Sequence, residues 1–147
     1  VLDARKCISY LTIESKEAIP LALRPLMGNR VFGCDDCQII CPWNRFASQS
    51  KEDDFTPRHN LDNPDLVTLF NWDQDEFLAN TEGSPIRRIG HERWLRNLAV
   101  GLGNAGGDSS ILQTLEKRAD DPSPLVREHV QWAIERQRDK LADITPE

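Results

Sequence analysis

The stretch FGCDDCQIICPWN, residues 32–44, holds three of the four cysteines in this chain. Cys34, Cys37 and Cys41 have the spacing Cys-x2-Cys-x3-Cys-Pro, whereas Cys7 lies far upstream. No basic-then-apolar leader is visible at the start of the sequence, so the cysteines indicate a metal site or redox chemistry more than structural disulfides.

Three kinds of site compete for these cysteines. A structural zinc site usually takes two short-spaced pairs, and only Cys34 and Cys37 form one. A thioredoxin-like Cys-x-x-Cys motif would leave Cys41 and its proline unexplained. The two-cluster ferredoxin run is Cys-x2-Cys-x2-Cys-x3-Cys-Pro, and its last cysteine ligates the other cluster. The chain matches the last three cysteines and the proline of that run, with Val31 at the first cysteine position.

The ligand count extends the iron–sulfur interpretation. Cys7 can replace the missing thiolate, so Cys7, Cys34 and Cys37 would serve one cluster and Cys41 the other. Two four-iron clusters take about eight thiolates, and one complete cysteine run upstream of Val1 would supply the rest. The opening VLDARKCISY also reads like the middle of a domain, so we expect a longer protein. A single site closed by all four cysteines, with zinc or one cluster, stays an alternative.

Composition limits the other functions. The chain has 147 residues, 39% of them hydrophobic and 29% charged, which suits one ordinary domain or two small ones. Its apolar runs are too short to span a membrane. The net charge of −6 argues weakly against a general nucleic-acid binder.

One segment nevertheless has a local excess of basic residues. PIRRIGHERWLRN, residues 85–97, contains four arginines against one glutamate and could hold phosphate. The arginines are Arg87, Arg88, Arg93 and Arg96. A solvated arginine face is the alternative, and Arg96 could instead make structural contacts between repeats.

The remaining segments predict mainly helices. ISYLTIES, residues 8–15, alternates apolar and polar residues like a strand or an extended segment. Residues 18–29 predict a short helix interrupted near Pro25 and closed by Gly28. The polar residues 47–63 form a connector.

Helix-capping signals follow the connector. Asn63 and Pro64 predict the start of a helix over residues 64–72. Asp73 is expected to cap residues 74–81, and Asp108 to cap residues 109–119.

Two segments near the end of the chain resemble one another. WLRNLAVGLGNAG, residues 94–106, aligns without a gap with LVREHVQWAIERQ, residues 125–137. Arg96 and Arg127 occupy equivalent positions. The two segments are offset by 31 residues. Helix pairs that recur at a period of this length indicate a short HEAT-like α-solenoid.

Three stretches together resemble the C-terminal portion of the epoxyqueuosine reductase family. They are LDARKCISYLTIE (2–14), GNRVFGCDDCQIICPWN (28–44) and SPIRRIGHERWLRNLAVGLGN (84–104). The displaced cysteine, the Cys-Asp-Asp-Cys turn and the Cys-Pro-Trp-Asn ending occur in the family's order, and the resemblance runs to about residue 138.

The resemblance implies a mainly α fold: the C-terminal half of a ferredoxin-like iron–sulfur module followed by a short HEAT-like repeat domain. We expect the module at 1–46, the connector at 47–63, the repeats at 64–142 and a tail at 143–147. It also implies two [4Fe–4S] clusters, with ligands Cys7, Cys34, Cys37 and Cys41 as counted above.

The implied activity is the reduction of epoxyqueuosine to queuosine in tRNA. Cobalamin and the catalytic acid would lie in an N-terminal domain outside this chain, which alone should be inactive. The basic segment would face the tRNA anticodon stem-loop, and Trp43 and Asn44 would pack near the cofactor. We further expect a cytoplasmic monomer with no membrane contact, reduced by a flavodoxin or ferredoxin. Two rival functions remain: a zinc-stapled helical scaffold for protein partners, and an electron-transfer module of an unrelated reductase.

Overall fold

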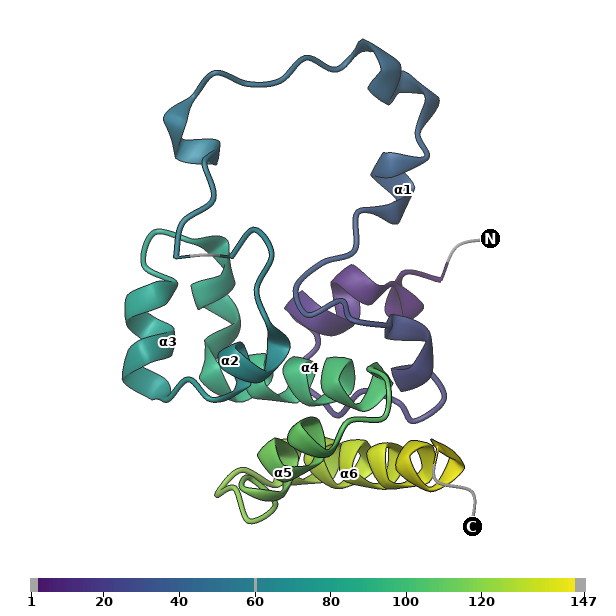
Figure 1. Ribbon diagram of the computed structural model, residues 1–147. Helices are drawn as coiled ribbons and strands as arrows, with labels where there is room; N and C mark the ends of the chain where they lie inside the picture. Colours follow the sequence, from purple (N-terminus) through teal and green to yellow (C-terminus); the bar gives the residue numbers. More distant parts are fainter. Residues whose placement is uncertain (1–2, 60, 145–147) are drawn as a thin grey trace.

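The computed structural model describes residues 3–59 and 61–144, and within these ranges it contains helices but no strand (Figure 1). The described α-helices are α1 (Asp36–Ile39), α2 (Leu66–Phe70), α3 (Gln74–Asn80), α4 (Gly90–Asn104), α5 (Ser109–Glu116) and α6 (Pro124–Ile144). Shorter 3-10 turns are η1 (Ala4–Lys6), η3 (Arg24–Met27), η4 (Pro42–Phe46), η5 (Asp53–Phe55) and η6 (Pro85–Ile89), and η2 (Tyr10–Glu14) is a π-helix. The prediction of a mainly α fold is confirmed.

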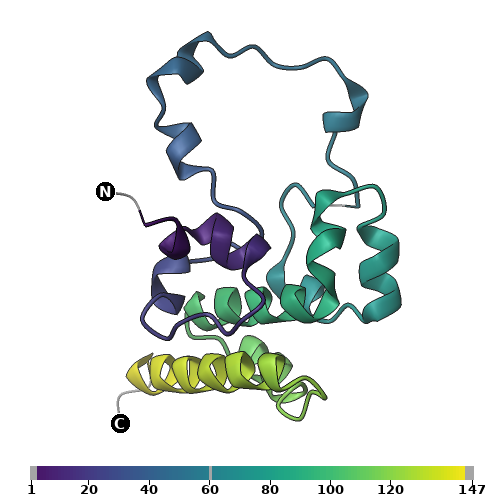
Figure 2. The same cartoon turned by 180° about the vertical axis from the view of Figure 1, so that it is seen from behind.

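Helix α4 is the centre of the fold. It lies between α5 and α6 on one side and the N-terminal segment with α2 and α3 on the other (Figures 1 and 2). Every residue from Trp94 to Gly103 is buried, so the helix has no solvent-facing stripe over this span. The main core combines α4 with side chains of its neighbours: Leu69, Phe70, Phe77, Leu115, Val126, Val130, Ala133 and Ile134.

Helices α4 and α6 lie very close together at Gly103. A Cβ atom built on Gly103 would lie 2.6 Å from Cζ3 of Trp132 and 3.0 Å from the Cα of Ala133. Both distances are too short for carbon atoms, so this crossing requires glycine. The two segments of similar sequence lie in these two helices, which pack side by side.

Polar residues of α4 hold the N-terminal segment through its backbone. The Arg96 guanidinium donates to the carbonyl oxygens of Leu11, Ser15 and Glu17 at 2.7–2.9 Å. Beside it, Asn97 donates to the carbonyls of Thr12 and Val31 at 2.9 and 2.8 Å. Both side chains are completely buried, so these bonds replace hydration that the segment loses on packing.

A buried histidine connects the same segment to α6. His129 Nε2 accepts a hydrogen bond from the Ile19 amide at 3.1 Å, and Nδ1 donates to the Leu125 carbonyl at 2.7 Å. This pattern fits the neutral imidazole, and burial lowers the pKa of His129 to about 4. Nearby, the buried Arg24 forms an ion pair with Glu128.

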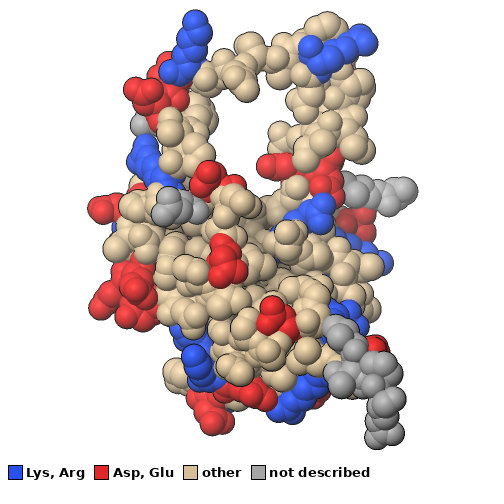
Figure 3. Space-filling model, viewed as in Figure 1, with Lys and Arg blue, Asp and Glu red and all other residues tan. Residues whose placement is uncertain are grey.

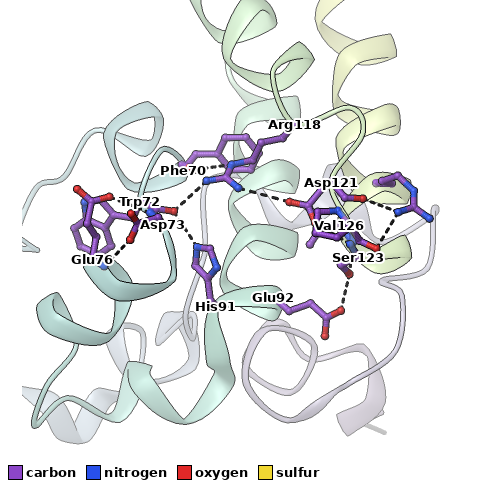
Figure 4. A network of polar contacts seen from close by, with 12 residues as sticks. Phe70, Trp72, Asp73, Glu76, His91, Glu92, Arg118, Asp121, Ser123 and Val126 are labelled. Atoms are coloured by element: carbon purple, nitrogen blue, oxygen red, sulfur yellow. Dashed lines mark hydrogen bonds and ion pairs between the residues drawn. The ribbon is translucent and has the colours of Figure 1, made fainter.

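A polar network ties the turn between α2 and α3 to the loop between α5 and α6 (Figure 4). The Trp72 carbonyl accepts from His91 at 2.9 Å and from Arg118 at 3.0 Å. Across the first turn of α4, the Ser123 hydroxyl donates to Glu92 at 2.5 Å. These bonds hold the α2–α3 turn, the start of α4 and the α5–α6 loop together.

Residues 35–59 form an arm that rises from the body and returns to it (Figures 1 and 3). The described side chains along the arm are exposed, except that of Cys41, which is half-buried. Large apolar side chains are among them: Ile39, Ile40, Trp43, Phe46 and Phe55 are 64–80% exposed. The arm therefore contributes nothing to the core of the described part.

Several predicted elements differ from the structure. Residues 8–14 are helical, not a strand, because tertiary bonds from α4 and a Thr12 hydroxyl bond to the Ile8 carbonyl outweigh β-branched propensity. The helix predicted at 18–29 shortens to η3, which ends at Gly28 with a positive φ of 59°. Asp65, not Asn63, caps α2, since its carboxylate accepts from the two following free amides, those of Val67 and Thr68.

Other expectations agree with the structure. Asp73 caps α3 in a capping box with Glu76, and Asp108 caps α5, so both N-cap predictions are confirmed. The predicted tail began at residue 143, but α6 runs to Ile144, and 145–147 lie outside the described residues. The division into module, connector and repeats stays a prediction.

Candidate metal centre

The three clustered cysteines lie on a loop with two left-handed residues. Cys34 stands between Gly33, with φ 75°, and Asp35, with φ 57°. Because an L side chain rarely adopts such a φ, the glycine suits the first position, and aspartate is among the residues that tolerate the second. The reversals turn the chain sharply around Cys34 before α1, which contains Cys37. Cys41 follows at the start of η4.

Cys7 reaches this loop from a distant part of the chain. It follows η1, and its pKa is lowered by hydrogen bonds from the backbone amides of Tyr10 and Ser9. The loop lies next to this turn: the Gly33 amide donates to the Thr12 hydroxyl at 3.0 Å. The Ser9 hydroxyl lies 4.0 Å from the position of a Cβ on Gly33. The fold thus brings the displaced cysteine's turn against the Cys34 loop.

A charged pair flanks Cys34. Nη2 of Arg30 lies 2.8 Å from each carboxylate oxygen of Asp36, the first residue of α1. Hydrogen bonding to Arg30, and secondarily to the Cys34 thiol, lowers the pKa of Asp36. The Asp36 carboxylate is the main cause of the raised pKa of Arg30, with the nearby Cys34 as a smaller one. Sequence analysis missed this pair, although opposite charges on both sides of Cys34 were a visible signal.

The donor set fits iron–sulfur chemistry as part of a ligand set. All four cysteines are free thiols, and Cys7 already accepts the amide hydrogen bonds typical of iron–sulfur ligands. Within residues 3–59 and 61–144, however, no three His, Cys, Asp or Glu side chains form a group that could hold a metal ion. The described residues therefore gather neither the closed four-cysteine site considered as an alternative nor the three cysteines assigned to one cluster, Cys7, Cys34 and Cys37.

The four arginines of the basic segment have different environments. Arg87 is exposed, and Arg88 forms an exposed ion pair with Glu14 at 2.6 Å. Arg93 is half-buried and donates to three carbonyls, including that of Ile13 at 3.0 Å. On the face seen in Figure 3, basic side chains are interspersed with acidic ones and form no single patch among the residues described.

The expectation for Arg96 must be corrected. Its side chain is completely buried and bound to backbone carbonyls, so it is not available to an external phosphate. Burial lowers its pKa to about 10, and it stays charged at neutral pH. Arg127, its equivalent in the second repeat, also donates to carbonyls, those of Asp121 and Pro122. The structural alternative holds for both positions.

The two residues expected near a cofactor lie on the arm. Trp43 is 76% exposed and pairs with the ring of Phe46, with 5.7 Å between centroids. Asn44 donates to the Gln38 carbonyl, which closes the turn after α1. Both residues are exposed, although the Asn44 amide is engaged by Gln38.

Comparison with known proteins agrees with this geometry. A family model described as a 4Fe-4S double cluster binding domain matches residues 1–44. The chain is 67% identical over 135 residues to epoxyqueuosine reductase of Pseudomonas aeruginosa, covering 92% of this chain and 37% of that protein. It is 60% identical to the Escherichia coli K12 enzyme, of which it covers 36%. The chain resembles epoxyqueuosine reductases.

Solved structures give the same result. A structure of epoxyqueuosine reductase from Bacillus subtilis matches with a TM-score of 0.84 at 31% identity, over 92% of this chain and 36% of that one. Another, of epoxyqueuosine reductase with an epoxyqueuosine-modified tRNA-Tyr stem loop, matches with a TM-score of 0.76 at 29% identity and the same coverage. The chain thus spans little more than a third of its epoxyqueuosine reductase relatives.

Proposed function

We propose that this chain is part of an enzyme that reduces epoxyqueuosine to queuosine in tRNA. The observation that carries the proposal is 67% identity to such a reductase over 92% of the chain, together with the placement of the Cys7 turn beside the Cys34 loop. The contribution of this chain would be iron–sulfur ligation and tRNA docking, and the catalytic acid would lie elsewhere.

The four cysteines would divide between two [4Fe–4S] clusters. Cys7, Cys34 and Cys37 would ligate one, and Cys41, at the base of the arm, would ligate the other. The division rests on the cysteine spacing and on the match of residues 1–44 to a 4Fe-4S double cluster binding domain, and each cluster would need thiolates from outside the chain. When bound, the clusters would supply single electrons for the reduction.

Residues of the chain would prepare this site. Hydrogen bonds from the amides of Tyr10 and Ser9 lower the pKa of Cys7, which favours the thiolate that iron binding would require. The exposed arm leaves Cys41 accessible to a second segment. Cobalamin would be held mainly outside this chain, and Trp43 and Asn44 would pack towards it.

Of the four arginines, we retain Arg87 as the foremost candidate for contact with tRNA. It is exposed, and no ion pair or hydrogen bond engages its side chain within the described residues. Residues shortly before Arg87 in the sequence, among them Asn80, Ser84 and Ile86, line a cavity of about 270 Å³. Arg88 would join Arg87 by exchanging Glu14 for phosphate.

The tRNA proposal has a direct test with a matched control. Arg87→Ala in the complete gene product should weaken binding of the anticodon stem-loop and reduce the slope of log affinity against log salt by about one unit. Arg138→Ala removes another exposed arginine, which lies on α6 and pairs with Glu116, and should leave the slope unchanged. Equal slopes for both variants would remove Arg87 from the interface.

The metal proposal is tested by elemental analysis. The complete gene product, purified without oxygen, should contain about eight irons and matching acid-labile sulfide. Cys37→Ala should lower the iron content while the far-ultraviolet circular dichroism stays helical. Stoichiometric zinc without sulfide would overturn the reductase and favour the zinc-stapled scaffold.

The remaining partners follow from the same proposal. The reductase would act in the cytoplasm as a monomer and would take electrons from a flavodoxin or ferredoxin. No described helix has the length and apolar character needed to cross a bilayer. Anaerobic reduction by each candidate donor, with queuosine in tRNA as the readout, would identify the donor.

A further inference from the structure

We propose that Arg30 and Asp36 form a charge pair that sets the reduction potential of the cluster ligated by Cys34. The inference rests on the proposed function, because it needs a cluster at that cysteine. It assigns a positioning and tuning role, not a catalytic one, to two paired residues that flank Cys34 in the sequence and are not themselves ligands.

The geometry places both charges at the ligand loop. Asp36 stands between Cys34 and Cys37, and Arg30 reaches it from the segment before the loop. Arg30 Nη2 lies 2.8 Å from both oxygens of the carboxylate, so the two side chains are held together and not merely near each other. Asp36 comes two residues after Cys34 and directly before Cys37, so the carboxylate of the ion pair lies between the two proposed ligands in the sequence.

Ligation changes the balance among the three side chains. As a thiol, Cys34 can donate its proton to the Asp36 carboxylate, but an iron-bound thiolate has no proton to donate. The carboxylate would then face a second negative group. The guanidinium of Arg30 compensates both, because it binds the carboxylate and offers further N–H donors towards sulfur.

Removing one charge or the other of the pair should therefore shift the reduction potential of the cluster in opposite directions. Reduction adds negative charge, so a nearby cation favours it and a nearby anion opposes it. Arg30→Gln leaves the carboxylate uncompensated and should lower the potential. Asp36→Asn leaves the guanidinium uncompensated and should raise it. The double variant should return towards the wild-type value, because the pair as a whole is neutral.

The test is an anaerobic redox titration of the complete gene product, followed by electron paramagnetic resonance of the reduced clusters. The four proteins are wild type, Arg30→Gln, Asp36→Asn and the double variant. Arg138→Gln and Glu116→Gln break an exposed ion pair of 2.6 Å between α6 and α5 and serve as controls. Opposite shifts from the two loop variants, confined to one cluster, are expected. Shifts of the same sign, or shifts no larger than in the controls, would overturn the proposal.

Iron and sulfide analysis of each protein keeps the outcomes separate. A wild type without clusters would overturn the proposed function and this inference with it. A wild type with clusters but unshifted variants would overturn the inference alone. If Arg30→Gln loses its cluster, Arg30→Lys should retain it, and Asp36→Asn still has to raise the potential. A lowered or unchanged potential in Asp36→Asn would then refute the tuning role.

Discussion

The body of this chain buries polar side chains, whereas the arm exposes large apolar ones. In the body, Arg96 and Asn97 are completely buried, and their donors bind backbone carbonyls of the N-terminal segment. In the arm, Ile40, Trp43 and Phe55 are 76–80% exposed. The body is internally satisfied, whereas the arm has the composition of an interface without its partner. Substitutions in the two regions should therefore differ sharply in effect.

The largest effect is expected at Arg96. Arg96→Met keeps most of the side-chain volume but leaves the carbonyls of Leu11, Ser15 and Glu17 without their donor. The free energy of unfolding should fall by about 3–5 kcal/mol, as for other broken buried networks. Urea unfolding measures the change. Arg138→Met, on the surface of α6, should cost no more than about 1 kcal/mol. Similar losses for both variants would contradict the structural role of Arg96.

A pH-dependent effect is expected from His129. Its pKa is about 4 in the folded chain and about 6.5 when unfolded, so the unfolded state binds more protons between these values. Stability from this group is complete above pH 6.5 and falls by roughly 3 kcal/mol as the pH drops to 4.

The His129 effect is isolated by a variant that does not titrate there. His129→Gln can still accept from the Ile19 amide, so its stability should fall less steeply over the same range. The difference between the two unfolding curves, measured at several pH values, removes the contribution of the carboxylates. Parallel curves would mean that His129 is not buried in its neutral form.

A smaller effect is expected where α4 crosses α6. Gly103→Ala forces a methyl group against Trp132 and Ala133 and should destabilise the protein by about 1–3 kcal/mol. Gly106→Ala is the matched control, because a Cβ added there would meet nothing within 4 Å and its φ is not positive. That change should be neutral or slightly stabilising. Thermal denaturation of both variants separates steric crowding from a general glycine effect.

The smallest effect on stability is expected in the arm. Trp43→Ser should change the free energy of unfolding by less than about 0.5 kcal/mol, because the side chain is 76% exposed and pairs with the ring of Phe46, which is also exposed. Calorimetry of this chain gives the value. A loss as large as that expected for Gly103→Ala would show that the arm packs on the body, and the contrast between the two regions would fail.

Local chemistry in the sequence predicted much of this structure. The cysteine spacing, the caps at Asp73 and Asp108 and the similarity of the segments that form α4 and α6 depend on patterns that one sequence displays fully. The prediction for residues 8–14 was wrong because their helix is held by Arg96 and Asn97, which lie far away in the sequence. The sequence left two roles open for Arg96, phosphate contact and structural contact, because its charge is visible in the sequence but its burial is not.

The bonds from α4 to the N-terminal segment also have a mechanical consequence. Arg87 lies in η6, directly before α4, and Arg93, Arg96 and Asn97 hold the segment that carries Cys7. The single helix α4 therefore connects the proposed RNA contact to the segment that carries the proposed cluster ligand. A rotation of α4 by one residue would displace both ends together, so the spacing between the bound RNA and the electron path is set by the register of a single helix.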